Sequence, residues 1–213
     1  MITAVLLSWK RKQNMEKIIS ALRRQTVAPE IWLINNDDFE DYGADRLIAM
    51  PWNAGEWARY VIAGRVETEY CMFQDDDFML GDDHYLEDSL TIHTEKCPDA
   101  LLGVAGRGLQ ESYPYYWPDI VDRSGYTHIL KGHFQLFKSD IVRRARIPRH
   151  SSASDIYWSL DLSRGRAEHY VSQVLSRRLD TLNRFGIGYE FRQEHMDERN
   201  AVCLEWIQEQ VYA

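Results

Sequence analysis

The chain has 213 residues, 45% of them hydrophobic and 12% aromatic, with a formal net charge of −8, and this apolar content excludes an intrinsically disordered chain. The acidic balance argues against a general affinity for nucleic acid or for an anionic membrane surface. The three cysteines form no disulfide framework or CxxC motif, and no signal-peptide pattern or membrane-spanning stretch is present, so we expect a soluble, cytoplasmic protein.

Short apolar runs alternate with helical spacing in the first part of the chain. The predicted strands cover residues 3–8, 31–34 and 70–73. The first predicted helix covers residues 14–24, with Asn14 as its N-cap, and a second covers residues 56–65. Because strands and helices alternate, the pattern is typical of a parallel α/β sheet.

The later part of the chain predicts further elements of the same kinds. Strands are predicted over residues 101–105 and 128–137, and helices over residues 155–163 and 166–185, the last one closed by Gly186. The order of these strands is not readable from the sequence. No repeat, low-complexity tract or linker-like stretch indicates a domain boundary. The sequence therefore predicts an α/β fold in a single domain.

Three consecutive aspartates follow the third predicted strand. Asp75, Asp76 and Asp77 lie between the apolar residues 70–73 and 78–80, where like charges repel and water has poor access. A divalent cation offsets this cost most simply, and hard oxygen ligands suit Mg²⁺ or Mn²⁺. Alternate residues of an extended chain point the same way, so Asp75 and Asp77 can face one ligand while Asp76 turns aside. The alternative is an acidic turn that is hydrated or caps a helix.

The order of these motifs resembles the GT-A glycosyltransferases. A first strand followed by Ser8-Trp9-Lys10-Arg11, a second ending in carboxylates and a third ending in a DxD-type motif carry this resemblance. Residues 53–77 are similar, more narrowly, to the exostosin-like, retaining branch, in which an Asn and an Arg precede a strand ending in DDD. Shorter similarities follow at Gly106-Arg107, at residues 131–134 and 154–156, and at Arg199, which stands one residue further from Cys203 than in that branch.

The resemblance covers most of the chain, although only the DDD segment is specific. It implies a GT-A fold, a Rossmann-like mixed sheet flanked by helices in a single domain. Residues 1–80 would form a nucleotide-binding half ending in the DxD motif, and residues 81–213 an acceptor- and sugar-binding half. In size and character the chain also resembles viral glycosyltransferases that decorate a capsid glycan.

The resemblance further implies a UDP-sugar donor, a glycan or glycoprotein acceptor, and Mn²⁺ or Mg²⁺ as cofactor. The residues it assigns to nucleotide-sugar binding are Ser8, Lys10, Arg11, Asp37, Asp38, Arg59, Asp75, Asp76 and Arg107. Either Asp37 or Asp38 would accept the uracil N–H, and the sequence does not separate them. Asp77 would bind the metal directly, Asp75 would bind the ribose or the metal through water, and His195, in a predicted loop, is the candidate third ligand.

The resemblance places Asp155 beside the anomeric carbon. In a retaining enzyme this carboxylate stabilises an oxocarbenium-like state or acts as nucleophile, and in an inverting enzyme it is the general base. Asp161 is a weaker substitute, and a first-turn helix carboxylate is the plain structural alternative for Asp155. Arg199 would neutralise the departing diphosphate. The aromatic run at residues 113–117 would line the acceptor site or pack as a loop.

Two other classes of function remain open from the sequence. A metal-dependent nucleotidyltransferase would share the sheet and the carboxylates, but it would want a glycine-rich phosphate loop that Ser8-Trp9-Lys10-Arg11 does not provide. A non-catalytic nucleotide- or sugar-binding module would keep the fold without the chemistry. The expectation of a retaining glycosyltransferase depends on the family resemblance.

Overall fold

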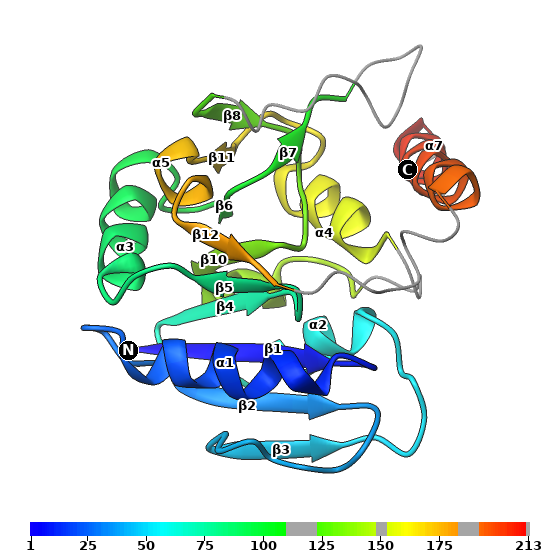
Figure 1. The fold of residues 1–213 in the computed structure, drawn as a ribbon. Coiled ribbons are helices and arrows are strands. Elements are labelled where there is room, and N and C mark those ends of the chain that lie inside the picture. The colour runs from blue at the N-terminus through cyan, green and yellow to red at the C-terminus, as the bar shows by residue number, and fades with distance from the viewer. Residues whose placement is uncertain (110–122, 148–152, 183–191, 212–213) are drawn as a thin grey trace.

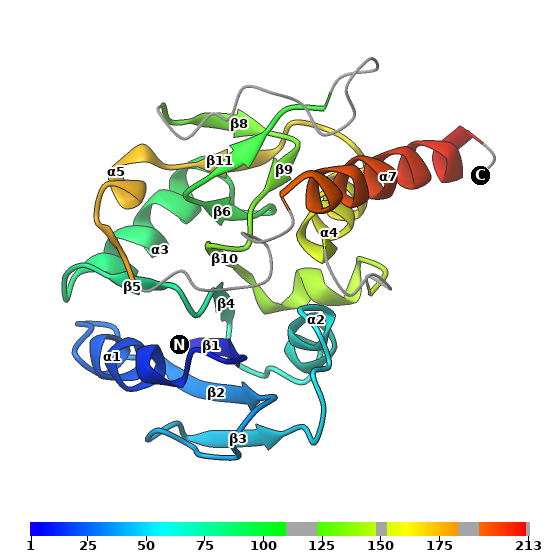
Figure 2. The same ribbon diagram turned by 45° about the vertical axis from the view of Figure 1, so that its right-hand side comes forward.

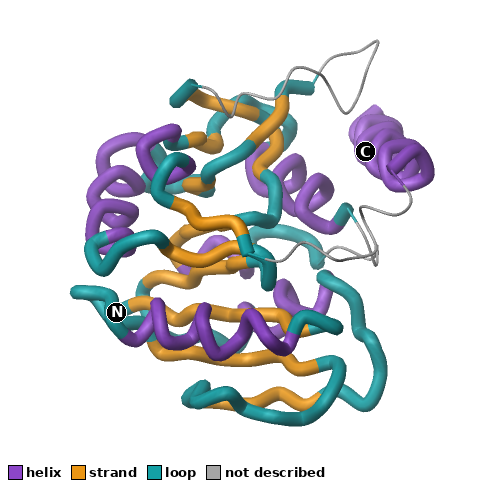
Figure 3. The backbone as a smooth tube through the Cα atoms, viewed as in Figure 1, coloured by secondary structure: helices purple, strands orange, loops and turns teal. Residues whose placement is uncertain are grey.

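Strands and helices alternate through the N-terminal part of the computed structural model, which describes residues 1–109, 123–147, 153–182 and 192–211 (Figures 1 and 3). The strands are β1 (Ile2–Ser8), β2 (Glu30–Asn35), β3 (Arg46–Ala49) and β4 (Tyr70–Gln74), and the helices are α1 (Lys12–Arg23) and α2 (Trp57–Ala63). These four strands run parallel to one another. The predicted strands and helices of this part are confirmed, whereas β3, which has only four residues, was missed.

The strands join one eight-stranded mixed sheet in the order β3-β2-β1-β4-β10-β6-β11-β8. Its remaining members are β6 (Leu102–Gly103), β8 (Gly125–Thr127), β10 (Phe134–Lys138) and β11 (His169–Val171). β10 runs antiparallel to both β4 and β6, which makes the sheet mixed. Two small sheets pair β5 (Phe78–Leu80) with β12 (Leu179–Thr181), and β7 (Gly106–Arg107) with β9 (Ile129–Leu130). The predicted α/β class, with a mixed sheet flanked by helices, is confirmed.

Helices cover both faces of the sheet because successive strand residues point to opposite sides. Ala4 and Leu6 of β1 belong to the apolar cluster that includes α1 and α3 (Tyr85–Lys96), whereas Val5 belongs to the cluster that includes α2. Figure 2 shows α1 and α2 on opposite sides of β1 and β2. The second cluster also takes in the 3₁₀ helix η1 (Ser139–Arg143) and Trp158 of α4 (Ser154–Ser163). Within the described ranges, no helix combines the length and apolarity needed to cross a membrane.

The chain ends in a long helix, α7 (Arg192–Val211), which packs against α4. Its residues Val202, Cys203 and Trp206 share an apolar cluster with Ile156 and Leu160. The expectation of a loop around residue 195 was therefore wrong, since this segment lies within α7. The weak separation of polar and apolar positions along α7 gave no clear helical signal, and its packing on α4 is a tertiary effect.

Two predicted element limits were wrong near the strand that carries the three aspartates. Helix α1 begins at Lys12, so Asn14 is not its N-cap; the Asn14 side-chain amide instead donates to the backbone carbonyl of Asp76 at 2.8 Å. The predicted strand over residues 128–137 is divided into β9 and β10 by a turn at Gly132. A Cβ at this glycine would lie 2.5 Å from the Arg59 guanidinium, so a side chain here would displace the Arg59 side chain.

The helix predicted over residues 166–185 was also wrong. This segment contains β11, the short helix α5 (Gln173–Ser176) and β12. β11 inserts between β6 and β8, whose residues lie far away in the sequence, and no local periodicity reveals such pairing partners. The predicted strand over residues 101–105 is reduced to β6, because the chain then leaves the main sheet to form β7. Gly186, the predicted cap, lies outside the described residues.

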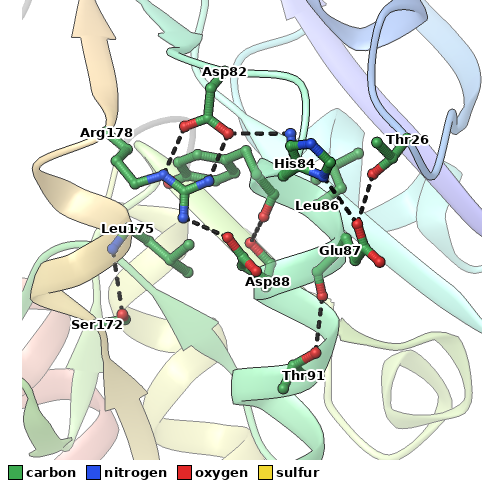
Figure 4. Close-up of polar contacts among 12 residues, drawn as sticks. Thr26, Asp82, His84, Leu86, Glu87, Asp88, Thr91, Ser172, Leu175 and Arg178 are labelled. Atoms are coloured by element: carbon green, nitrogen blue, oxygen red, sulfur yellow. Dashed lines mark hydrogen bonds and ion pairs between the residues drawn. The ribbon is translucent and has the colours of Figure 1, made fainter.

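Arg178, between α5 and β12, forms ion pairs with residues at the start of α3 (Figure 4). Its guanidinium donates two hydrogen bonds to the Asp82 carboxylate, at 2.5 and 2.6 Å, and one to Asp88 at 2.6 Å. The contact holds β12 beside β5, and the backbone N–H of Leu182 donates to the carbonyl of Asp77 at 2.8 Å. Arg178 therefore stabilises the position of β12, whose next residue, Leu182, contacts the backbone of Asp77.

Replacing Arg178 by Ala should lower the free energy of unfolding by about 1–2 kcal/mol, because a bidentate ion pair is lost from a side chain that is only 27% exposed. Urea denaturation measures this change. Arg24→Ala is the matched control, since Arg24 is 55% exposed and lies 3.4 Å from Asp83; it should cost less than about 0.5 kcal/mol. Equal effects of the two substitutions would contradict the assignment of Arg178.

Candidate active site

Unsatisfied polar atoms gather where β1 and β2 end. Ser8 and Asn35 are opposite each other in the parallel register, and Asn36 follows directly, its backbone N–H donating to the Ser8 carbonyl at 3.1 Å. The Ser8 hydroxyl and the Asn36 side-chain oxygen are buried and accept or donate no hydrogen bond within the described part of the chain. Buried polar atoms are normally paired, so these two favour a polar ligand at this edge. Asn36 was not among the predicted site residues.

The structure separates the two acidic candidates after β2. Asp38 accepts hydrogen bonds from the Asn35 amide, at 2.7 Å, and from the Tyr42 hydroxyl. Burial opposes ionisation of Asp38, but these hydrogen bonds outweigh it and lower its pKa. Asp37 is exposed and Asp38 is half-buried, so Asp37 is the more open of the two to solvent. Lys10 is exposed too, with its ammonium 5.2 Å from the centre of the Trp9 ring.

The loop after β1 turns toward the aspartates. Arg11 forms an ion pair with Asp76, and its guanidinium lies 3.4 Å from Asp77. The backbone N–H of Trp9 also donates to Asp76 at 3.4 Å. Burial raises the pKa of Asp76, although Arg11 opposes that effect. Asp76 thus joins the β1–α1 loop to the end of β4.

Asp75 faces a different arginine. The Arg59 guanidinium, which is buried on α2, donates to the Asp75 carboxylate at 2.9 Å. The backbone N–H of Asp75 donates to the carbonyl of His133 at 3.2 Å, and the Gly132 backbone lies against both side chains of the pair. One arginine from the β1–α1 loop and one from α2 therefore balance part of the charge of the three aspartates.

Asp155 and Arg199 form a buried ion pair between α4 and α7. The Arg199 guanidinium donates to Asp155 Oδ2 at 2.8 Å. The side chain of Asp155 is only 4% exposed and that of Arg199 only 8%. Asp155 Oδ1 accepts the backbone N–H of Ile156 at 3.0 Å. Burial by itself would raise the pKa of Asp155, but the Arg199 charge and hydrogen bond outweigh it and lower that pKa. The carboxylate is therefore ionised at neutral pH.

Glu56, at the start of α2, connects the Arg59–Asp75 pair with the helix that carries Asp155. It was not identified from the sequence. Its carboxylate accepts the backbone N–H of Ser154, and it lies 3.6 Å from the Arg59 guanidinium. Burial and the nearby Asp155 raise the pKa of Glu56 to about 7, against the opposing charges of Arg59 and Arg199. Its position three residues before Arg59 was the one available signal, since residues so spaced on a helix are neighbours.

The remaining candidates make other contacts or lie outside the described side chains. Arg107 is buried on β7, and its carbonyl accepts a hydrogen bond from a neighbouring strand. Asp161 binds Arg146, which donates to it at 2.7 Å from both the backbone and the guanidinium. His195 belongs to α7, but its side chain is not described, and residues 113–117 lie outside the described ranges. Among the described side chains, no group of three potential metal ligands comes together.

The shifted pKa of Glu56 leads to a prediction about stability and pH. The unfolded chain releases this proton near pH 4.3, whereas the folded chain releases it at about pH 7. The stability that protonated Glu56 provides is therefore fully present below about pH 4.3 and is lost as the pH rises through 7. Over this pH range, the free energy of unfolding of the metal-free wild type should fall by about 1–2 kcal/mol relative to Glu56→Gln. The full pKa shift implies a larger loss, at about 1.4 kcal/mol per pKa unit. The expected loss is smaller because water reaches the Glu56 side chain, which is 26% exposed.

Urea unfolding of both proteins at about pH 4.5 and pH 8 measures this loss. Subtracting the variant removes the pH dependence of the other carboxylates, Asp155 included, to first order. A difference between wild type and variant that stays constant with pH would contradict the raised pKa.

Comparison with known proteins identifies the fold. No family model matches the sequence, and no curated protein does. The chain is similar to S. aureus TarS 1-349 in complex with UDP-GlcNAc, with a TM-score of 0.64, 12% identity, and coverage of 92% of this chain and 60% of that one. It is also similar to the mannosyltransferase PcManGT from Pyrobaculum calidifontis in complex with GDP-Man and Mn²⁺, with a TM-score of 0.62, 13% identity, and coverage of 96% and 64%.

A second structure of S. aureus TarS matches with a TM-score of 0.57 and 13% identity over 80% of this chain and 35% of that one. The chain thus spans less than two thirds of each of these proteins. At such identities the likeness establishes the fold, which this chain shares with structures that hold nucleotide-sugars.

Proposed function

We propose that the chain is a metal-dependent glycosyltransferase that moves a sugar from a UDP-sugar to a hydroxyl group of a glycan or glycoprotein. The observation that carries this proposal is the convergence of three features at one edge of the sheet: the unsatisfied Ser8 and Asn36, the Asp75–Asp77 segment, and the Asp155–Arg199 pair joined to it through Glu56 and Arg59. In open α/β sheets, ligands bind beyond the carboxyl ends of the strands.

Each part of this edge suits one part of a nucleotide-sugar. The polar atoms at the ends of β1 and β2 suit a base or ribose, with Asp37 the carboxylate open to a uracil N–H. The resemblance to UDP-dependent enzymes and the UDP-GlcNAc held by TarS support UDP, whereas the GDP-Man held by PcManGT makes a guanine donor the first alternative. Arg11 and Arg59, which hold the aspartates, would assist a diphosphate.

The aspartates fit a hard divalent cation. They offer carboxylate oxygens, and a cation held by one or two carboxylates completes its coordination with phosphate oxygens and water. Asp77 and Asp75 would hold Mn²⁺ or Mg²⁺, with His195 as a further proposed ligand; the Mn²⁺ in the PcManGT structure supports a divalent metal. When bound, such an ion acts as a Lewis acid that stabilises charge on the departing nucleoside diphosphate.

Asp155 would act on the sugar. Arg199 keeps this carboxylate ionised and fixes its direction. An ionised carboxylate serves equally to stabilise an oxocarbenium-like state, to attack it, or to take a proton from the acceptor hydroxyl. The resemblance to the exostosin-like branch supports retention of anomeric configuration, and the resemblance to viral enzymes supports a capsid glycan as the acceptor. Nuclear magnetic resonance of the product anomer distinguishes retention from inversion.

The test is incubation with a panel of UDP- and GDP-sugars in the presence of Mn²⁺ or of EDTA. We expect release of UDP from one donor that requires the metal and increases with a glycan acceptor. Nucleotide-sugar binding without release would instead support a binding module, and release of pyrophosphate from a nucleoside triphosphate would support a nucleotidyltransferase. A protein that neither binds nor turns over any donor in the panel would lead us to reject the proposal.

A further inference from the structure

Glu56 lies between the aspartate segment and the Asp155–Arg199 pair of the candidate active site. One carboxylate oxygen accepts the backbone N–H of Ser154, the first residue of α4, and the other faces Arg59, which holds Asp75. Asp155 is the next residue of α4. A single side chain on α2 thus contacts both the helix that carries the candidate catalytic carboxylate and the arginine that binds the aspartate segment.

Among the described residues, helix α4 receives no side-chain capping hydrogen bond from its N-cap residue. Its N-cap residue is Ala153, which has no polar side chain and adopts a left-handed conformation with φ of 59°. The first N–H groups of a helix have no partner within it, and a carboxylate at this end satisfies one of them and complements the helix dipole. The carboxylate of Glu56 supplies that acceptor from another helix.

Charged residues from four different segments of the chain surround the Glu56 carboxylate. Arg59 on its own helix, Asp155 on α4, Arg199 on α7 and Asp75 after β4 all act on this carboxylate. The positive charges of Arg59 and Arg199 oppose the repulsion of Glu56 by the carboxylates of Asp155 and Asp75. Displacing Glu56 therefore alters the position of the Asp155 turn relative to Arg59 and Asp75 rather than one isolated contact.

We propose that Glu56 is a positioning residue that caps α4 from α2 and holds Asp155 at a fixed place relative to the Arg59–Asp75 pair. The inference rests on the proposed function, because it gives Asp155 its role in sugar transfer. Glu56 acts through Asp155 and does not itself react with the sugar. Because small displacements of a reacting group slow catalysis strongly, the effect of losing Glu56 should fall on kcat.

The experiment compares Glu56→Ala and Glu56→Gln in the full chain. Glu56→Ala should lower kcat about a hundredfold with little change in the KM for the donor, and it should speed amide hydrogen exchange at Ser154. Glu56→Gln keeps an oxygen that accepts the Ser154 N–H, so it should preserve the slow exchange and recover most of the lost kcat. Glu209→Gln is the matched control, since Glu209 joins α7 to α4 through Tyr157 and Arg146; it should change the melting temperature without changing kcat.

Three results would overturn the inference. Unchanged exchange at Ser154 in Glu56→Ala would show that the cap does not exist. Faster exchange with unchanged kcat would show a purely structural cap, and a raised donor KM with unchanged kcat would assign Glu56 to donor binding. A wild-type protein that turns over no donor would instead reject the proposed function, and the Ser154 exchange would still decide the cap, so the two failures are distinguishable.

Discussion

Replacing Asp155 by Asn should reduce sugar transfer on the order of a thousandfold while donor binding persists. The amide keeps the size of the side chain and an oxygen for the Ile156 N–H, but it removes the negative charge that the proposed function assigns to sugar transfer. Loss of a positioned carboxylate that serves as base, nucleophile or electrostatic stabiliser commonly costs two to four orders of magnitude, roughly the effect expected here. Steady-state rates of nucleotide release measure the loss.

The same substitution also disturbs the fold, because it leaves Arg199 buried without its carboxylate partner. Thermal unfolding and donor binding must therefore be measured on the same preparation. Asp161→Asn decides between the two carboxylates of α4, since Asp161 is bound by Arg146. If Asp161→Asn abolishes transfer and Asp155→Asn does not, the assignment of Asp155 is wrong.

Replacing Asp77 by Ala should weaken metal-dependent donor binding about a hundredfold or more, because a directly coordinated cation contributes several kcal/mol. Asp76 and Arg11 keep their ion pair in this variant, so the β1–α1 loop retains its anchor. Calorimetric titration with a UDP-sugar in the presence of Mn²⁺, and again with EDTA, measures the effect. The wild type should respond to Mn²⁺ and the variant should not.

Asp83→Ala is the matched control for Asp77, since Asp83 is 53% exposed and pairs with Arg24 on the surface. It should bind the donor as the wild type does. Donor binding that still depends on Mn²⁺ in Asp77→Ala would show that the metal is held elsewhere.

Several candidate residues were predictable because strand order and chemistry coincide in the sequence. Each parallel strand ends at the same edge of the sheet, so residues after β1, β2 and β4 are placed together as soon as those three strands are recognised. The aspartates after β4 also stand out as a charged run between apolar residues. Their partners were less readable, because nothing in the sequence indicated that Arg11, assigned to nucleotide-sugar binding, forms an ion pair with Asp76.

The sequence by itself determined the α/β class, the three central parallel strands, and the aspartates at the end of β4, because these depend on local apolar runs and on the fixed geometry of parallel strands. Only the tertiary structure decided that Glu56 links Arg59 to α4 and that α7 brings Arg199 to Asp155. It also decided that residues 169–171 form a strand rather than part of a helix. The physical reason is that these contacts join segments far apart in the chain, and their energy comes from burial and charge pairing that no local pattern records.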